Sequence, residues 1–224
     1  MNRREFLTTT LAAGAATSTA SAAGTPGTKA VKIIGVSCSP RKGKTTAAAL
    51  GICLEAARAV DPRVTTELIE LAGRNIGVYD PVDPKAVQGG FAELIPVLSS
   101  PDVAALVIGT PVYFGNMSSL CKAFLDHWMV FRQQNFALAG KVGGVVAVGA
   151  GRNGGLELTL QSVQASLMGQ NMIVVGDGQP TSHFGATLIN TNDDISKDDF
   201  GVNTAKNLGR HVAEVALRLT RTGS

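Results

Sequence analysis

The sequence predicts a three-layer α/β/α sandwich, in which a parallel sheet is covered by helices on both faces. Three observations support this fold class. Segments typical of strands and helices alternate between residues 31 and 219. Several strand segments are apolar on both faces, which is typical of a parallel sheet buried between helices. Roughly 200 residues follow a leader-like N-terminal segment, which is enough for one domain with its own core.

Five strand segments and five helix segments make up this alternation. The strand segments are residues 31–36, 64–70, 103–109, 142–148 and 172–175. The helix segments are residues 45–60, 86–98, 119–132, 156–167 and 202–219. Five β-α units of this kind predict a doubly wound sheet of five parallel strands. Ligands bind such sheets outside the carboxyl ends of the strands, so the loops that follow the strands are expected to carry the site.

The loop after the first strand is the most distinctive of these loops. Residues 37–46 read S-C-S-P-R-K-G-K-T-T and run directly into an alanine-rich helix. The N–H groups and the positive dipole end at the start of that helix would point into the loop. Further donors come from the side chains of Ser37, Ser39, Arg41, Lys42, Lys44, Thr45 and Thr46. The sequence therefore predicts a phosphate-binding loop.

A P-loop for a nucleoside triphosphate is an alternative interpretation of this loop. Gly43-Lys44-Thr45 matches the end of the pattern G-x-x-x-x-G-K-[ST], but Cys38 stands where its first glycine should be. The third strand also lacks a carboxylate at its end to help hold magnesium. A P-loop-like nucleotide binder is therefore the weaker hypothesis. A solvated basic turn without a ligand is a further alternative.

Other loops at the same edge are suited to a flat ring attached to that phosphate. Tyr113 and Phe114, after the third strand, offer a stacking surface. Gly115 and the glycines at 149, 151, 154 and 155 would let the backbone approach a ring closely. Together, the loops predict a site for a planar, partly apolar group tethered to a phosphate.

The same segments resemble the flavodoxin-like NAD(P)H-dependent FMN reductase family. The similar segments are GVSCSPRKGKTT (35–46), GTPVYFGNMSS (109–119), GAGRNGGLE (149–157), HFGA (183–186) and AKNLGRHVAE (205–214). The resemblance covers most of residues 30–217. It implies a flavodoxin-like sheet with the strand order 2-1-3-4-5, and it implies FMN as the cofactor.

The resemblance also implies a role for each loop in binding FMN. The phosphate would be held by Ser37, Ser39, Arg41, Thr45 and Thr46, with Lys44 adding a charge. The isoalloxazine ring would lie along Pro111, Val112, Tyr113, Phe114, Gly115 and Asn116. The pyrimidine edge of the ring would be covered by Gly149, Gly151, Arg152, Asn153 and Gly154. Apart from the resemblance, the charge of Arg152 suggests a cation near N1 and O2 of the ring, where it would stabilise the reduced flavin; a solvated arginine is the open alternative. Pro111 is expected to end the third strand.

The expected function is an FMN-dependent oxidoreductase that passes electrons from NAD(P)H or another donor to a quinone or a similar small acceptor. The flavin does the chemistry in such enzymes, and the sequence shows neither a catalytic constellation nor metal-ligand spacing. One alternative is a non-enzymatic FMN electron carrier, although flavodoxins are usually strongly acidic and this chain has a formal charge of +3. Another is a binding module without flavin.

Several conspicuous side chains have a structural interpretation. Cys38 is expected to pack inside a tight loop rather than to act as a redox thiol. His127, Trp128 and Phe131 follow one helix face, which predicts a place in the core or a subunit interface. For His183, a role in the site and a structural role are both open. Some relatives carry closely spaced iron–sulfur cysteines after the second strand; residues 74–81 contain none, so an FMN-only protein is expected.

The N-terminus predicts export. Arg3-Arg4, a weakly hydrophobic stretch and A-x-A at 20–22 are typical of a twin-arginine signal. We expect a signal peptide at 1–22, a linker at 23–29 and the FMN-binding domain at 30–220. The twin-arginine translocase would then deliver the protein to the periplasm. The signal stretch is too short and too polar to remain as a membrane span.

The charge of the mature chain disfavours two classes of partner. Cleavage after Ala22 removes Arg3, Arg4 and Glu5, so the formal charge falls from +3 to +2. A charge this small, without a basic stripe, argues against a nucleic acid or a membrane surface as the partner. The expected partners are a small-molecule electron donor and acceptor, and a second copy of the chain in a homodimer.

Overall fold

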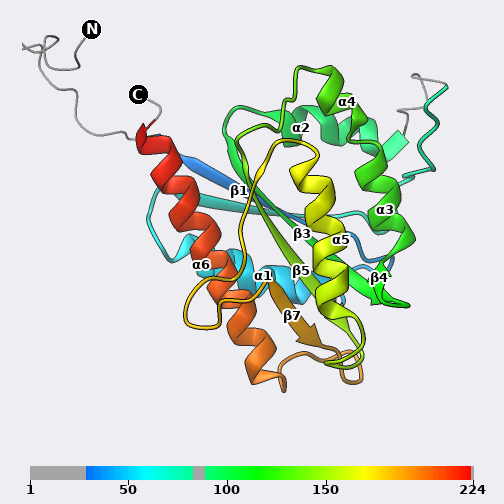
Figure 1. The fold of residues 1–224 in the computed structure, drawn as a ribbon, viewed down its shortest axis with the longest axis vertical. Helices are drawn as coiled ribbons and strands as arrows, with labels where there is room; N and C mark the ends of the chain where they lie inside the picture. The colour runs from blue at the N-terminus through cyan, green and yellow to red at the C-terminus, as the bar shows by residue number, and fades with distance from the viewer. Residues whose placement is uncertain (1–28, 83–88, 223–224) are drawn as a thin grey trace, which may run out of the picture.

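The computed structural model describes residues 29–82 and 89–222, which form one sheet between two layers of helices (Figure 1). Five parallel strands follow the order β2-β1-β3-β5-β6 across the sheet. They span Val64–Glu70, Val31–Ser37, Val103–Tyr113, Val142–Gly149 and Ile173–Val174. Counted among the five predicted strands, this is the order 2-1-3-4-5 of flavodoxin-like sheets. The predicted fold class is therefore confirmed.

The outer edge of the sheet, beside β5, is built from two short strands. β6 pairs with residues 142–143 of β5. After residues 175–185 leave the sheet, β7 (Ala186–Ile189) pairs with residues 146–149 of the same strand. β7 could not be predicted from the sequence, because a four-residue segment is too short to show a strand period. β7 brings the chain back to the carboxyl end of β5, so the loop after it lies at the predicted site edge.

Three of the predicted helices are confirmed with small changes in length: α1 (Thr45–Arg58), α5 (Leu156–Met168) and α6 (Asp199–Thr222). The predicted helix at 119–132 is broken into α3 (Ser119–Asp126) and α4 (Met129–Gln133).

The predicted helix at 86–98 is also shorter than expected. Its first three residues lie outside the described ranges, Gly89–Leu94 forms a 3₁₀ helix, and only Ile95–Ser99 is α-helical (α2). Gly89 has a φ of +72°, which an α-helix does not accommodate.

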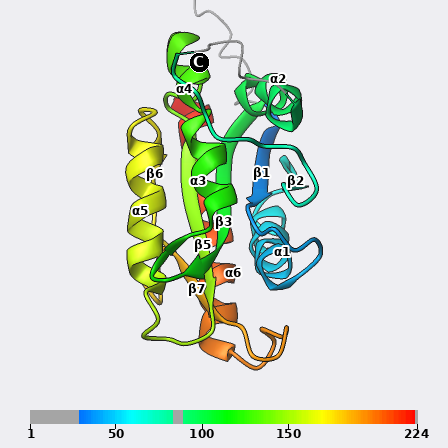
Figure 2. The same cartoon turned by 90° about the vertical axis from the view of Figure 1, so that its right-hand side faces the viewer.

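Helices lie on both sides of the sheet (Figure 2). The sheet separates two hydrophobic cores. Successive residues of a strand point to opposite faces, and both Ile33 and Ile34 of β1 are fully buried. Ile33 belongs to the core under α1 and α6, whereas Ile34 belongs to the core under α2 to α5. This burial on both faces is what the apolar strand segments predicted. Helices α1 and α6 pack so closely that a Cβ atom on Gly209 would lie 1.9 Å from the carbonyl oxygen of Cys53.

The face covered by α3 and α4 contains an aromatic cluster. His127, Trp128 and Phe131 are almost fully buried there. The ring of His127 stacks on Phe91 with a centroid distance of 4.9 Å, and its Nε2 lies 2.9 Å from the carbonyl oxygen of Gly77. His127, Trp128 and Phe131 were predicted to lie either in the core or at a subunit interface, and the structure places them in the core.

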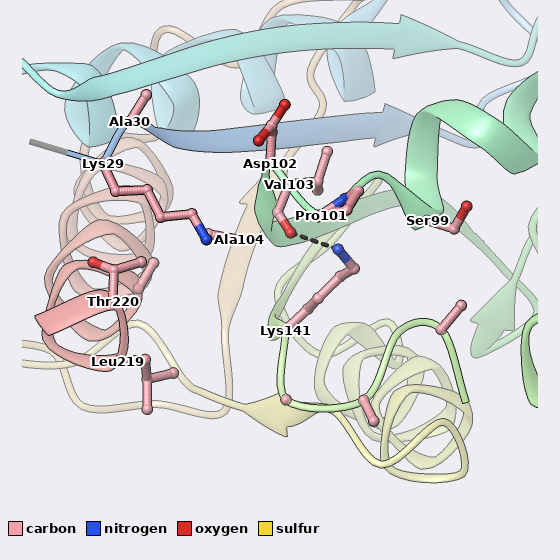
Figure 3. A pocket seen from close by; sticks show the side chains of 14 residues that line it. Lys29, Ala30, Ser99, Pro101, Asp102, Val103, Ala104, Lys141, Leu219 and Thr220 are labelled. Carbon is pink, nitrogen blue, oxygen red and sulfur yellow. Dashed lines mark hydrogen bonds between the residues drawn. The ribbon is translucent and has the colours of Figure 1, made fainter. Parts of the chain in front are cut away.

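A cavity of about 510 Å³ lies at the amino ends of β3 and β5, opposite the predicted site edge. Lys141 borders it, and its Nζ donates a hydrogen bond of 2.6 Å to the carbonyl oxygen of Val103 (Figure 3). A second hydrogen bond, of 2.7 Å, goes to the carbonyl oxygen of Ser100. Burial lowers the pKa of Lys141, with the nearby Lys29 acting in the same direction. The two bonds join the start of β5 to the start of β3, so Lys141 serves the fold.

Candidate functional site

The loop between β1 and α1 presents unused hydrogen-bond donors. Ser37, the last residue of β1, is buried, and its Oγ has no hydrogen-bond partner within the described part of the chain. Lys44 is the N-cap residue of α1, and no side-chain hydrogen bond caps this helix end. Thr45 and Thr46, in its first turn, are both buried. An orphaned hydroxyl beside an uncapped helix start is an arrangement suited to an anion.

Two carboxylates that could not be singled out from the sequence, those of Asp193 and Glu70, contact this loop. Nη1 of Arg41 lies 2.6 Å from Oδ1 of Asp193, and Nζ of Lys44 lies 3.2 Å from its Oδ2. The N–H of Gly43 donates to Oε2 of Glu70 at 2.7 Å. Both cationic side chains are about half exposed. The loop is therefore closed on its solvent side by ion pairs and hydrogen bonds across the fold.

The loop after the third predicted strand is a β-hairpin, not an irregular loop. β3 continues to Tyr113 and pairs with β4 (Asn116–Met117) across a two-residue turn. Phe114 and Gly115 form this turn with φ values of +50° and +74°, as in the type I′ turn that suits hairpins.

The expectation that Pro111 ends the strand is therefore wrong. Pro111 pairs with Val148 of β5, whereas the pairing of β3 with β1 stops at Gly109. Pro111 lies beyond the last β3 residue that pairs with β1, so its missing N–H costs no hydrogen bond to that strand.

The hairpin lies against the loop that follows β5. A Cβ atom on Gly155 would come within 2.6 Å of the Cα of Gly115, and one on Gly149 would lie 3.4 Å from the Cβ of Val112. The side chain of Tyr113 is 45% exposed and that of Phe114 is fully exposed. The predicted ring segments therefore do meet at one edge, and their aromatic side chains are open to a ligand.

Ser118 joins the hairpin to the phosphate loop. Its Oγ donates to the carbonyl oxygen of Cys38 (2.7 Å) and accepts from the N–H of Cys121 (3.1 Å), which caps α3. Its own N–H donates to Oγ1 of Thr110 at 3.0 Å. A single buried serine therefore fixes the positions of both halves of the predicted site. A serine just before a helix is a capping signal, but nothing local in the sequence indicates its contact with Cys38.

Cys38 is a packing residue, as expected. It is fully buried, and burial together with the adjacent Cys121 raises the pKa of its thiol well above the ordinary value. A thiol in this state stays protonated and is a poor nucleophile.

Arg152 is anchored away from the hairpin. Its guanidinium donates to Asp198 and to the carbonyl oxygen of Thr187 (3.0 Å), and it lies over the ring of Phe200 at 4.9 Å. Asp198 also accepts from the N–H of Gly201, so it caps the start of α6. The charge of Arg152 is thus shared with Asp198. A position of Arg152 beside the isoalloxazine ring of FMN stays a prediction. Three further predicted residues of this loop precede α5. Gly151 is partly exposed, and Asn153 and Gly154 are exposed.

His183 lies at the same edge of the sheet. Its Nδ1 is 3.6 Å from Oδ2 of Asp177, which is fully buried, and its ring meets Phe200 edge to face. Together with Arg152 it borders a cavity of about 490 Å³ beside β7. The structure thus places His183 next to the glycine-rich loop, on the side away from the hairpin.

These features define a flavodoxin-like α/β protein with a cation-rich loop and an aromatic hairpin at one sheet edge. Its sequence matches the NADPH-dependent FMN reductase family over residues 31–187. The chain therefore belongs to this family and is a flavin-dependent oxidoreductase with FMN as its cofactor. The resemblance noted in the loops is confirmed.

Individual proteins agree with this assignment. The chain is 37% identical to an iron–sulfur flavoprotein from Methanocaldococcus jannaschii, over 83% of this chain and 97% of that protein. It is 33% identical to an NAD(P)H dehydrogenase (quinone) from Aromatoleum aromaticum, over 61% of this chain and 73% of the relative. The apo form of an NADH:FMN oxidoreductase has a similar fold, with a TM-score of 0.59 and 21% identity, over 86% of this chain and 91% of that one.

The Ser118 link can be tested by removing its hydroxyl. Ser118→Ala should lower the free energy of unfolding by about 2 kcal/mol, because α3 loses its cap and the buried Cys38 carbonyl loses a donor. Ser119→Ala, at the exposed next position, is the matched control and should change it by less than about 0.5 kcal/mol. Urea unfolding of both variants gives the comparison. Equal stabilities would show that the two loops do not depend on Ser118.

Proposed function

We propose that the protein passes electrons from NAD(P)H, or another two-electron donor, through bound FMN to a quinone or a similar small acceptor. The observation that carries the proposal is the joining of an uncapped helix start, with its orphaned Ser37 hydroxyl, to an exposed aromatic hairpin. A phosphate ester with a flat ring matches both parts. Neither part alone would distinguish FMN from a simple anion or an apolar ligand.

The residues present fit FMN in this orientation. Ser37, Ser39, Thr45 and Thr46 would bind the phosphate together with the free N–H groups of α1. The hairpin and the glycine-rich loop would hold the ring between backbone surfaces. When bound, FMN supplies the site that accepts and releases the electrons. The protein then needs only to hold the ring, keep one face open and exclude competing ligands.

The names of two relatives bear on the electron acceptor and on an iron–sulfur cluster, and the cysteines of this chain bear on the cluster as well. A relative named an NAD(P)H dehydrogenase (quinone) supports a quinone as the acceptor. The relative from M. jannaschii is named an iron–sulfur flavoprotein, yet Cys38, Cys53 and Cys121 are all buried in the described structure. The described ranges also hold no group of three His, Cys, Asp or Glu side chains placed for a metal. We propose that this protein uses FMN without a cluster.

Anaerobic stopped-flow mixing with NADH and with NADPH tests the proposed reaction. At least one nucleotide should bleach the flavin absorbance in a single fast phase, and a soluble quinone should restore it. Tyr113→Ala should weaken FMN binding about two- to tenfold by removing a stacking surface worth about 0.5–1.5 kcal/mol. Turnover should fall further, because hydride transfer depends on ring position to about an ångström.

Phe136→Ala is the matched control for this experiment. Phe136 is another partly exposed aromatic residue, and it adjoins Ala137 of the cavity at the opposite edge. It should leave both affinity and turnover unchanged. Flavin that neither nucleotide reduces, but that a one-electron donor does, would favour the electron-carrier alternative. Equal behaviour of the two variants would mean that the hairpin is not the ring site.

We also propose that the protein is exported by the twin-arginine translocase to the periplasm and works there as a homodimer. Arg3-Arg4 and the A-x-A site at 20–22 support export, and both lie outside the described residues. Among the described residues no helix is long and apolar enough to cross a membrane. A periplasm holds little NAD(P)H, so export would favour another physiological donor.

Light scattering that gives a monomer mass would contradict the dimer.

Exchange of both arginines tests the export signal. Arg3→Lys with Arg4→Lys should retain the protein in the cytoplasm, while its flavin content stays the same because the signal lies outside the FMN-binding domain. Cell fractionation with immunodetection measures the distribution, and an Arg58→Lys variant controls for arginine exchange elsewhere. If the double variant still reaches the periplasm, the signal is of another kind.

A further inference from the structure

The loop after β7, residues 190–194, contacts both halves of the candidate site. The N–H of Asn190 donates to the carbonyl oxygen of Gly149 at 2.7 Å, at the start of the glycine-rich loop. Asp193, three residues later, reaches the phosphate loop and pairs with Arg41 and Lys44. The 190–194 loop therefore ties the phosphate side of the site to the ring side.

The backbone of this loop holds the Asp193 carboxylate in place. Thr191 and Asp194 exchange two backbone hydrogen bonds of 2.8 and 3.0 Å across a tight turn. Asn192 and Asp193, at its centre, have φ values of +53° and +61°. Asn and Asp are the side-chain-bearing residues that adopt this left-handed region most readily. The turn therefore places Asp193 beside the phosphate loop as part of the fold, and its carboxylate reaches Arg41 and Lys44 from there.

The carboxylate uses the two cations that a phosphate would use. Its Oδ1 lies 2.6 Å from Nη1 of Arg41 and its Oδ2 lies 3.2 Å from Nζ of Lys44. Hydrogen bonds from Arg41 and then Lys44 hold the pKa of Asp193 below its ordinary value, so it is ionised at neutral pH. A phosphate monoester near α1 brings the same kind of charged acceptor to the same donors.

The other hydrogen-bond donors of the phosphate loop do not have to choose between Asp193 and a phosphate. The Oγ of Ser37 has no partner within the described part of the chain, and the start of α1 has no side-chain cap. These groups can donate hydrogen bonds to a phosphate without breaking a bond to another side chain. Arg41 and Lys44, in contrast, must leave Asp193 or share their charge with it. Two anions close together on two cations repel each other, and this repulsion weakens the binding of the one that can leave.

We propose that Asp193 is the internal counter-anion of the phosphate loop and limits its affinity for phosphate monoesters. This inference deepens the proposed function, because it takes residues 37–46 as the phosphate site. Asp193 occupies Arg41 and Lys44 in the free protein and competes with the incoming phosphate for them. It therefore sets how strongly the site prefers a phosphorylated flavin over the same flavin without phosphate.

Replacing the carboxylate by its neutral amide tests this role. Asp193→Asn in the flavin-free protein should bind FMN about three- to tenfold more tightly, as expected for one exposed charge removed at close range. Inorganic phosphate should gain by a similar factor, whereas riboflavin should bind equally well to both proteins. The gain should shrink in 1 M salt, where charges are screened within about 3 Å. Quenching of flavin fluorescence and calorimetry with phosphate give the affinities.

Asp194→Asn is the matched control. Asp194 is the next residue of the loop and bonds Ser196 instead of the cations, so its amide should leave the three affinities unchanged. An unchanged or weaker affinity of Asp193→Asn for FMN and phosphate would overturn the inference, because Asp193 would then only position the cations. If neither ligand binds the wild-type protein, the inference fails as well.

The inference and the proposed function can fail separately in this experiment. If FMN does not bind but phosphate binds more tightly to Asp193→Asn, the counter-anion role stands and the flavin site is elsewhere. If FMN binds the wild-type protein and Asp193→Asn has no effect, the flavin site stands and the counter-anion role is wrong.

Discussion

The candidate site depends on the parallel pairing of β3 with β1 on one side and with β5 on the other. Ser37 pairs with Gly109, and Pro111 pairs with Val148, so β3 extends past the end of β1 while β5 still supports it. The free end of β3 can therefore turn back as a hairpin. Because all three strands end at one edge, the three loops that follow them meet there. The hydroxyl of Ser118 then fixes two of these loops to each other.

The phosphate loop combines stability without a ligand with readiness to bind one. A loop rich in cations and helix N–H groups would repel itself if all its donors were unmatched. Glu70 and Asp193 match the outer donors through exposed contacts, which are individually weak. The inner donors, at Ser37 and the start of α1, remain available. The loop can therefore keep its shape in the free protein and still exchange its outer partners for a ligand.

The strands and the loops of the site could be predicted from the sequence, but the contacts between loops could not. Apolar runs such as 31–36 and 103–109 define buried parallel strands, and parallel strands place their loops at one edge. The hairpin could not be predicted, because a proline after an apolar run is typical of a strand end, and only the early end of β1 shows why Pro111 is tolerated there. Asp193 pairs with Arg41, which lies 152 positions away in the sequence, and Asp198 pairs with Arg152, which lies 46 positions away. No local pattern encodes such a distant partner.

The central claim is that this edge of the sheet binds one FMN through the phosphate loop and the hairpin. Its most direct test is the identity of the flavin released when the purified protein is denatured. Chromatography of the supernatant should show FMN at about one per chain, with no iron in the protein. Mainly FAD, a bound nucleoside triphosphate in place of flavin, or no flavin at all would contradict the account.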